Sequence, residues 1–345
     1  MSILPRPAED LSANELLLQR YIAEANLGNT PNSRGAYIRQ ARLFVAWLDA
    51  TGRDLQTIAR ADLGEWRRTI ANAAPATQAA KVGSVKKLLA WASDEGVLQD
   101  LTAEDLQTRT PSGQRGALAT PPVPRKPIRR LTGEELRLVV NAPFALTTKT
   151  GKQRKVTLRD AVALALMGLH GLRESEVCEL RVGDLQPKNG GAVLTVRGKG
   201  RKERALTLAA DMLRLIRAYL QQTGRKLGNC DRDSYLLQSQ RGERLTRSAL
   251  FALVREVGRR VLSRDDLTPH WLRRTWATHI SREVRNGEGN LLKAAMPAPR
   301  LQREAGWASL QTAQNYVDAA AEEDEAPTAF YLGIAAPTPA NGAEE

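Results

Sequence analysis

Apolar residues recur every three or four positions through the first third of the chain, which is the period of an amphipathic helix. The pattern runs through "NELLLQRYIAEAN", "SRGAYIRQARLFVAWLDATG", "ARADLGEWRRTIAN" and "PATQAAKVGSVKKLLAWASDEG". Ser33 suits the N-cap of the second helix, and Gly52 and Gly96 suit the stops of the second and fourth. After a loose tail over residues 1–12, the sequence therefore predicts a bundle of four or five helices over residues 13–108.

The helical period is lost between residues 109 and 130. The stretch "RTPSGQRGALATPPVPRKPIRR" has four prolines within residues 121–127, a composition typical of an extended linker. A simple loop is the alternative, but a loop of this length would be unusual inside a compact domain. We therefore place a domain boundary in this stretch.

The pattern after residue 130 mixes helices with a hairpin. Thr132 and Glu135 in "LTGEELRLVVNA" have the spacing of a capping box, and "LRDAVALALMGLHGL" is apolar on nearly every side, as expected of a buried central helix. The β-prone runs "AVLTVR" and "RALTL" flank the basic turn "GKGRKE" and predict a hairpin. Further helices are predicted over residues 206–223, 245–262, 269–285 and roughly 297–320.

These patterns together define the expected fold class, which is mainly α. An N-terminal helical bundle would be joined to a mixed, mainly α domain over residues 131–320 that contains a small antiparallel β-sheet. An acidic tail over residues 321–345 would follow.

The distribution of charge narrows the functional classes. The 345 residues carry a net charge of +13, which divides into +5 for residues 1–130, +15 for residues 131–317 and −7 for residues 318–345. A basic excess indicates a polyanionic partner, either nucleic acid or an anionic membrane surface. The longest apolar run, "AVALALMGL", is about half the length that spans a bilayer. Nucleic acid is therefore the expected partner, and no membrane association is expected.

The cysteines, the histidines and the start of the chain indicate which cellular location and which cofactors to expect. Cys178 and Cys230 lack CxxC spacing, and no charged and then apolar leader opens the chain, so we expect a cytoplasmic protein. Three histidines and two distant cysteines give no ligand spacing for zinc. The GxxxxGK[ST] phosphate loop is also absent. We expect neither a metal nor a cofactor.

The stretch "TPHWLRRTWATHI", residues 268–280, combines two histidines with two adjacent arginines. Thr268 can cap a helix whose first residue is Pro269. His270 and Arg273 would then share a face near the helix N-terminus, where free N–H groups attract anions. A histidine can move protons at a phosphate while an arginine holds its oxygens. Taken alone, the segment also fits a basic surface helix.

Three further segments carry candidate reactive residues. "GLHGLRESEVCELRVGDL" places Arg173 just after the central helix, and Glu176 follows at helical spacing. "RGKGRKER" places Lys199 between two glycines at the hairpin turn. "REAGWASLQTAQNYVDAA" places Trp307 nine residues before Tyr316. Taken singly, these residues also fit a salt bridge, a basic β-turn and a packed helix face.

Together the segments resemble the tyrosine recombinase (phage integrase) family. The matching positions are Arg173 and Glu176 of the first box, Lys199 of the β-hairpin, His270 and Arg273 of the His-x-x-Arg box, Trp307 at the later His-or-Trp position, and Tyr316 as the nucleophile. Five elements in the right order are far more specific than any one of them. Arg274 stands where many members have histidine, but it remains a hydrogen-bond donor. The front helices also resemble the family's core-binding domain.

The resemblance implies a site-specific DNA recombinase that forms a 3′-phosphotyrosyl intermediate and exchanges strands through a Holliday junction. The implied roles are nucleophile for Tyr316, phosphate clamps for Arg173 and Arg273, proton transfer for His270, protonation of the departing 5′ oxygen for Lys199, an indole N–H donor for Trp307, and support for Glu176 and Arg274. The implied partners are double-stranded DNA with inverted-repeat sites and three further copies of the chain in a homotetramer. The need for accessory DNA-bending factors stays open.

Several points remain hypotheses with stated alternatives. Candidate DNA contacts in the front domain are Arg39, Arg42, Lys81, Lys86 and Lys87, each of which also suits a solvated helix face. The apolar patch over residues 330–334 is expected to dock on a neighbouring protomer, with a frayed terminus as the alternative. Two rival functions are a catalytically silent DNA-binding regulator and a type IB-like topoisomerase.

Overall fold

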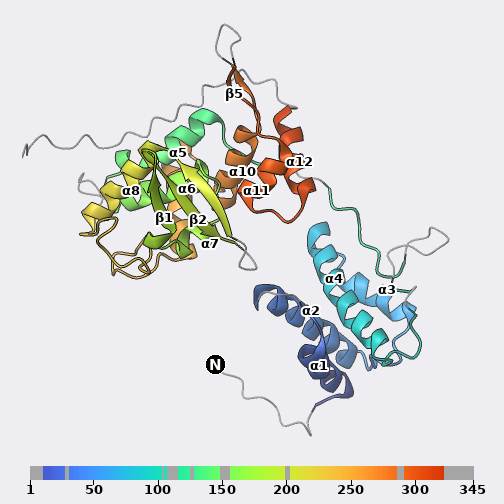
Figure 1. The fold of residues 1–345 in the computed structure, drawn as a ribbon. Coiled ribbons are helices and arrows are strands. Elements are labelled where there is room, and N and C mark those ends of the chain that lie inside the picture. Colours follow the sequence, from blue (N-terminus) through green and yellow to red (C-terminus); the bar gives the residue numbers. More distant parts are fainter. Residues whose placement is uncertain are drawn as a thin grey trace, which may run out of the picture. The chain divides into compact units, whose positions relative to one another are not determined.

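The chain folds into two compact units, Met1–Lys126 and Pro127–Glu345 (Figure 1). The computed structural model describes residues 11–27, 31–102, 105–106, 116–124, 128–147, 156–198, 203–285 and 291–321. Each unit is built around a hydrophobic core of its own. Lys199 and the apolar patch over residues 330–334 lie outside the described residues.

The front unit is a helical bundle. Its helices are α1 (Ala13–Glu24), α2 (Pro31–Ala50), α3 (Arg60–Thr69) and α4 (Pro75–Asp94). Gly52 and Gly96 follow α2 and α4, as predicted. The prediction of Ser33 as an N-cap is wrong, because α2 already begins at Pro31, and proline suits the first helical position.

The second unit contains the remaining elements of the described chain. Its helices are α5 (Gly133–Ala145), α6 (Thr157–Gly168), α7 (Glu174–Glu179), α8 (Ala210–Gln222), α9 (Arg247–Leu262), α10 (Pro269–Ile280), α11 (Ala298–Ala305) and α12 (Leu310–Ala321). Its strands are β1 (Leu185–Lys188), β2 (Gly191–Arg197), β3 (Glu203–Leu208), β4 (Val284–Arg285) and β5 (Leu291–Lys293). No helix in the described ranges is both long and apolar enough to cross a bilayer.

Helix α6 occupies the centre of the second unit. Each residue from Asp160 to Gly168 is buried, and α6 packs against α5, α8 and α10, so the predicted central helix is confirmed. The predicted capping box is also present, since Thr132 and Glu135 exchange side-chain and main-chain hydrogen bonds at the start of α5.

The small sheet is antiparallel, with strand order β1-β2-β3. The hairpin of β2 and β3 was predicted, but β1 was not, because "LQPK" is short and contains a proline. Helix α8 packs on this sheet (Figure 1). The predicted fold class, mainly α with a small antiparallel sheet, is confirmed.

Three predicted helices differ from the observed elements. Residues 206–208 belong to β3, so the helix expected from 206 begins at Ala210. The helix expected to reach 285 ends at Ile280 and gives way to β4. The helix expected over 297–320 is two helices, because Gly306 adopts a left-handed conformation (φ +64°) and ends α11.

Candidate active site

Helix α10 carries the central part of the candidate site. It begins at Pro269 after Thr268, whose side chain makes no capping hydrogen bond. Leu272 and Trp276 are buried and hold the helix in place. His270 lies exposed in the first turn, whereas the side chain of Arg273 points inward and is only 3% exposed.

Arg273 is held by main-chain carbonyls rather than by a carboxylate. Its two terminal nitrogens donate to the carbonyl oxygens of Gly171 and Ala305. The nearest carboxylate oxygen, Oε2 of Glu176, lies 4.0 Å from Arg273 Nη1. Burial, followed by the positive charge of Arg173, lowers the pKa of Arg273 to about 9. An anion that entered this site would favour the charged form of Arg273 and would itself be bound.

Arg173 and Glu176 form a compact pair at the start of α7. The main-chain N–H of Arg173 donates to Glu176 Oε2 over 2.8 Å, and Arg173 Nη1 donates to Oε1 over 2.7 Å. Arg173 Nη2 donates to the carbonyl oxygen of Gly306 over 3.2 Å. The first box of the sequence is therefore tied to the connection between α11 and α12.

The carboxylate of Glu176 also accepts two hydrogen bonds from Arg204 on β3, over 2.9 and 2.8 Å. Burial alone would raise the pKa of Glu176, but the hydrogen bonds and charge of Arg204, and then those of Arg173, outweigh it and lower the pKa. Glu176 therefore stays ionised and fixes two guanidinium groups at once.

Tyr316, on α12, stacks on Trp307, with ring centroids 5.0 Å apart and ring planes 7° from parallel. Trp307 also contacts Arg273, whose guanidinium carbon lies 5.4 Å from the centre of the indole ring. Tyr316 is buried, with 8% of its surface exposed. Trp307 therefore fixes the ring of the predicted nucleophile beside the predicted phosphate clamp.

Burial and the neighbouring positive charges shift the pKa of Tyr316 in opposite directions. The pKa of Tyr316 is raised overall, because the effect of burial outweighs the opposing effect of the positive charges of Arg274 and Arg273. The pKa of His270 is lowered, first by partial burial and then by the charges of Arg274 and Arg273. A histidine that is neutral at pH 7 is able to accept a proton.

His279, the second histidine of the same helix, lies elsewhere. Its Nε2 is 3.1 Å from the carbonyl oxygen of Leu131, and the side chain is buried. Burial lowers its pKa to about 4. His279 thus connects α10 to the start of the second unit and takes no part in the cluster around Tyr316.

The structure brings most of the predicted site residues together. The cluster comprises Arg173, Glu176, His270, Arg273, Arg274, Trp307 and Tyr316. Arg204 and the carbonyls of Gly171, Ala305 and Gly306 were not predicted. A signal for Arg204 was present in "ERALTL", because Arg204, Leu206 and Leu208 alternate along β3 and share its inward face.

Residues proposed for DNA contact in the front unit lie on α2 and α4. Arg39, Arg42 and Lys87 are exposed, and Lys81 and Lys86 are partly buried. Lys87 Nζ lies 4.3 Å from the centre of the Tyr37 ring, which joins the two helices. Burial lowers the pKa of Lys86. The exposed arginines are therefore the better placed of the five for contact with a polyanion.

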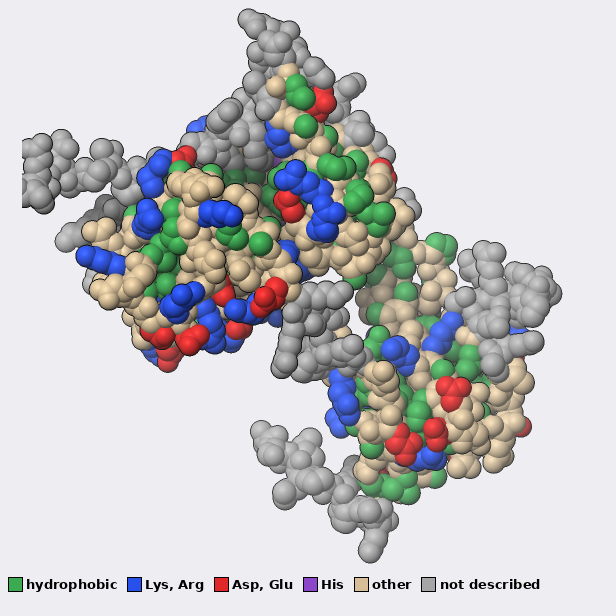
Figure 2. Space-filling view, in the orientation of Figure 1, with side chains coloured by type: hydrophobic (Ala, Val, Ile, Leu, Met, Phe, Trp, Pro, Cys, Tyr) green, Lys and Arg blue, Asp and Glu red, His purple; other side chains and the backbone are tan. Residues whose placement is uncertain are grey.

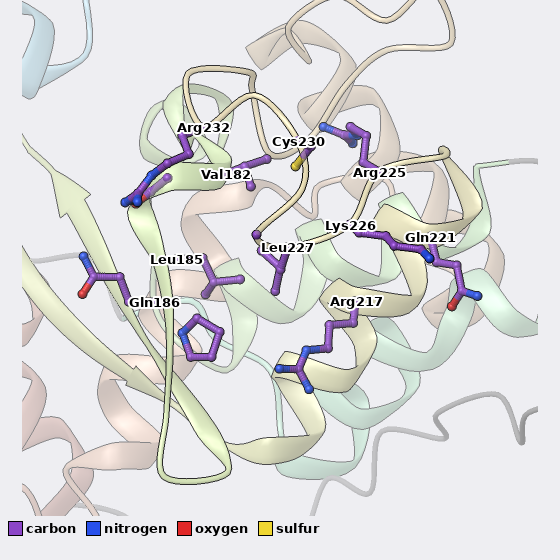
Figure 3. Close-up of a pocket in the computed structure, with 13 residues that line it drawn as sticks. Val182, Leu185, Gln186, Arg217, Gln221, Arg225, Lys226, Leu227, Cys230 and Arg232 are labelled. Carbon is purple, nitrogen blue, oxygen red and sulfur yellow. The ribbon is translucent and has the colours of Figure 1, made fainter.

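A separate pocket of about 700 Å³ lies between β1, the end of α8 and the loop that follows (Figure 3). Its walls carry Arg217, Arg225, Lys226 and Arg232, and none of the predicted catalytic residues. Within the described part of the chain, no group of three or more His, Cys, Asp or Glu side chains is placed to hold a metal ion.

Gly171 is expected to be essential for the stability of this site. It has φ +64°, and an added Cβ would lie 2.1 Å from the buried ring of Trp276. We expect Gly171→Ala to lower the free energy of unfolding by about 3 kcal/mol or more, from left-handed strain and overpacking combined. Gly242 is the matched control, since it has φ +79° with no atom near the added Cβ. Urea denaturation of both variants measures the difference, and equal losses would contradict the predicted contact with Trp276.

Comparison with known proteins agrees with this geometry. Residues 129–323 match the family model described as "Phage integrase family". The tyrosine recombinase XerC of Mycobacterium bovis is 28% identical over 297 residues, which cover 85% of this chain and 90% of that protein. The XerC of Mycobacterium leprae is 27% identical over the same length and shares of the two chains.

Solved structures share the fold. A XerH site-specific recombinase bound to a palindromic difH substrate superposes with a TM-score of 0.64 at 19% identity, covering 90% of this chain and 82% of that one. A lambda integrase tetramer bound to a Holliday junction gives a TM-score of 0.55 at 16% identity, covering 88% and 79%. The fold and the site define a recombinase of the tyrosine type. The chain belongs to the phage integrase family, which confirms the resemblance found in the sequence.

Proposed function

We propose that this protein cleaves and rejoins double-stranded DNA at specific sites through a covalent bond between Tyr316 and a 3′ phosphate. The observation that carries the proposal is the placement of Tyr316, which is stacked on Trp307 beside the buried Arg273 and lies close to the charge of Arg274. A buried tyrosine surrounded by guanidinium groups suits attack on a phosphodiester, because these groups stabilise both a phenolate and a phosphate.

The roles of the side chains follow from charge and reach. A tyrosine with a pKa of about 10 is a weak nucleophile near neutral pH, so it needs a proton acceptor, and His270 with its lowered pKa is suited to that task. Arg173 and Arg273 would stabilise the charge that develops on the non-bridging oxygens. Lys199 would protonate the departing 5′ oxygen. Because the phosphotyrosyl link conserves the bond energy, a 5′ hydroxyl can reverse the step without ATP.

The proposed partners are double-stranded DNA and further copies of the same chain. The XerH relative was solved with its difH substrate and the lambda integrase as a tetramer on a Holliday junction. We propose a homotetramer on inverted-repeat DNA here as well. The net charge of +15 over residues 131–317 supports binding of a polyanion, and Lys and Arg side chains are spread over the visible face of each unit (Figure 2). Residues 13–108 would form the core-binding domain and residues 109–130 the linker.

One experiment tests the proposal against its rivals. The site that the protein protects from nuclease is first found by footprinting, and a nicked suicide duplex carrying that site is incubated with the protein. We expect a covalent protein–DNA adduct that survives denaturation, and peptide mapping that locates it on Tyr316. Absence of an adduct would support a silent DNA-binding regulator. An adduct accompanied by relaxation of supercoils but no strand exchange would support a topoisomerase.

A further inference from the structure

Arg204 has no role in the proposal above, yet it is built into the site. It lies on β3 opposite Val196 of β2. Its side chain is 11% exposed. Its two terminal nitrogens donate to the two carboxylate oxygens of Glu176 over 2.9 and 2.8 Å. Such a two-pronged contact fixes the plane of the carboxylate as well as its position.

The orientation of the Glu176 carboxylate matters because Glu176 lies close to both Arg173 and Arg273. Glu176 is 2.7 Å from Arg173 but 4.0 Å from Arg273. Among the described residues, the hydrogen bonds of Arg273 go only to neutral main-chain carbonyls. Its positive charge is therefore not neutralised by a hydrogen-bonded carboxylate. If the carboxylate rotated, a close ion pair with Arg273 would form, and burial would strengthen it. That ion pair would compete with a phosphate for Arg273.

Arg204 also contacts the segment that carries Trp307. A Cβ added at Gly306 would lie 3.0 Å from Arg204 Nη1, so the guanidinium packs directly beneath this glycine. The carbonyl of Gly306 accepts from Arg173, and Trp307 follows. The Nε of Arg204 is buried and has no hydrogen-bond partner among the described residues. Among the described residues, the hydrogen bonds of the Arg204 guanidinium therefore go to Glu176, so Arg204 is placed to orient that carboxylate.

We propose that Arg204 is a positioning residue for DNA cleavage, which locks the Glu176 carboxylate onto Arg173 and away from Arg273, and so leaves Arg273 available to the scissile phosphate. This role rests on the proposed function of the site. Arg204 acts through Glu176, and no hydrogen bond among the described residues joins it to Tyr316. It also links β3, α7 and the connection between α11 and α12 into one unit.

The test uses the full-length protein and the suicide duplex described above. Arg204→Met keeps an unbranched apolar stem but removes the guanidinium fork. Arg197→Met is the matched control, since Arg197 lies on the neighbouring strand and pairs with Asp184 and Glu203 instead. We expect Arg204→Met to slow adduct formation at saturating protein about tenfold or more. Loss of a residue that orients a directly acting side chain has an effect of this size in metal sites. DNA affinity should change less than about threefold, because the loss concerns the transition state. Arg197→Met should keep the wild-type rate.

A double variant separates positioning from simple support of the fold. If Glu176 turns toward Arg273 when Arg204 is lost, then removing its charge with Glu176→Gln should release Arg273. The variant Arg204→Met/Glu176→Gln should therefore cleave at least as fast as Arg204→Met alone. A double variant about tenfold slower than Arg204→Met would overturn the proposal, because additive losses indicate independent structural roles.

A lysine variant and the wild-type protein complete the test. Arg204→Lys, which reaches only one carboxylate oxygen, should give an intermediate rate, and it replaces Arg204→Met in both the single and the double variant if the methionine variant does not fold. If the wild-type protein forms an adduct and Arg204→Met forms it equally fast, only the role of Arg204 is wrong. If the wild-type protein forms no adduct on its protected site, the proposed function fails and the role of Arg204 fails with it.

Discussion

Replacement of Tyr316 by phenylalanine is expected to abolish the covalent DNA adduct completely while binding to the DNA site survives. Phenylalanine keeps the ring that stacks on Trp307, so the packing of α12 is retained. Only the hydroxyl is lost, and no other group in the described cluster is an oxygen nucleophile of this kind. The measurement is denaturing gel electrophoresis of the protein with a suicide duplex, together with a mobility-shift assay for binding.

The matched control for this prediction is Tyr235→Phe. Tyr235 is partly buried and contacts Arg181, whose guanidinium carbon lies 4.9 Å from the ring centre, so it is also a tyrosine beside an arginine. It lies outside the cluster around Arg273, and its loss should leave adduct formation unchanged. An adduct that persists in Tyr316→Phe but disappears in Tyr235→Phe would move the nucleophile to a different part of the second unit.

The sequence identified the side chains that gather around Tyr316 more readily than the groups that hold them in place. Taken singly, Arg173, His270, Arg273 and Tyr316 fit ordinary structural roles, but their order along the chain and the family resemblance pointed to them together. Their supports are of another kind. The carbonyls of Gly171 and Ala305 that orient Arg273 belong to the main chain, and no side-chain pattern identifies a carbonyl as an acceptor.

The limits of the fold prediction have similar physical causes. The buried helix α6 was readily predicted because its apolar residues extend around its whole circumference. The break between α11 and α12 was missed because the amphipathic period continues on both sides of Gly306, and a single glycine inside a helical pattern is a weak stop signal. That break matters for the proposed site, because it brings the Gly306 carbonyl to Arg173 and turns Trp307 toward Tyr316.

Replacement of Arg273 is expected to have the second-largest effect, a loss of roughly a hundredfold to a thousandfold in the rate of adduct formation. The physical reason is the loss of a preorganised donor to the transition state, which costs about 3 to 4 kcal/mol in comparable sites. Arg273→Ala also leaves the carbonyls of Gly171 and Ala305 without their donor. Each buried unsatisfied carbonyl costs about 1 to 3 kcal/mol, so the alanine variant should be less stable as well as slower.

Arg273→Lys separates the two effects. Lysine keeps a positive charge and a donor for one of the carbonyls, so its melting temperature should lie closer to the wild type than that of Arg273→Ala. It cannot present two parallel N–H groups to a phosphate, so the rate of adduct formation should remain low. Arg214→Ala is the control, because Arg214 is exposed on α8 and pairs only with Asp211 among its described ion pairs. A lysine variant that cleaves as fast as wild type would show that Arg273 contributes only its charge to the reaction. The two hydrogen bonds from its guanidinium to main-chain carbonyls would then stabilise the fold rather than support the reaction.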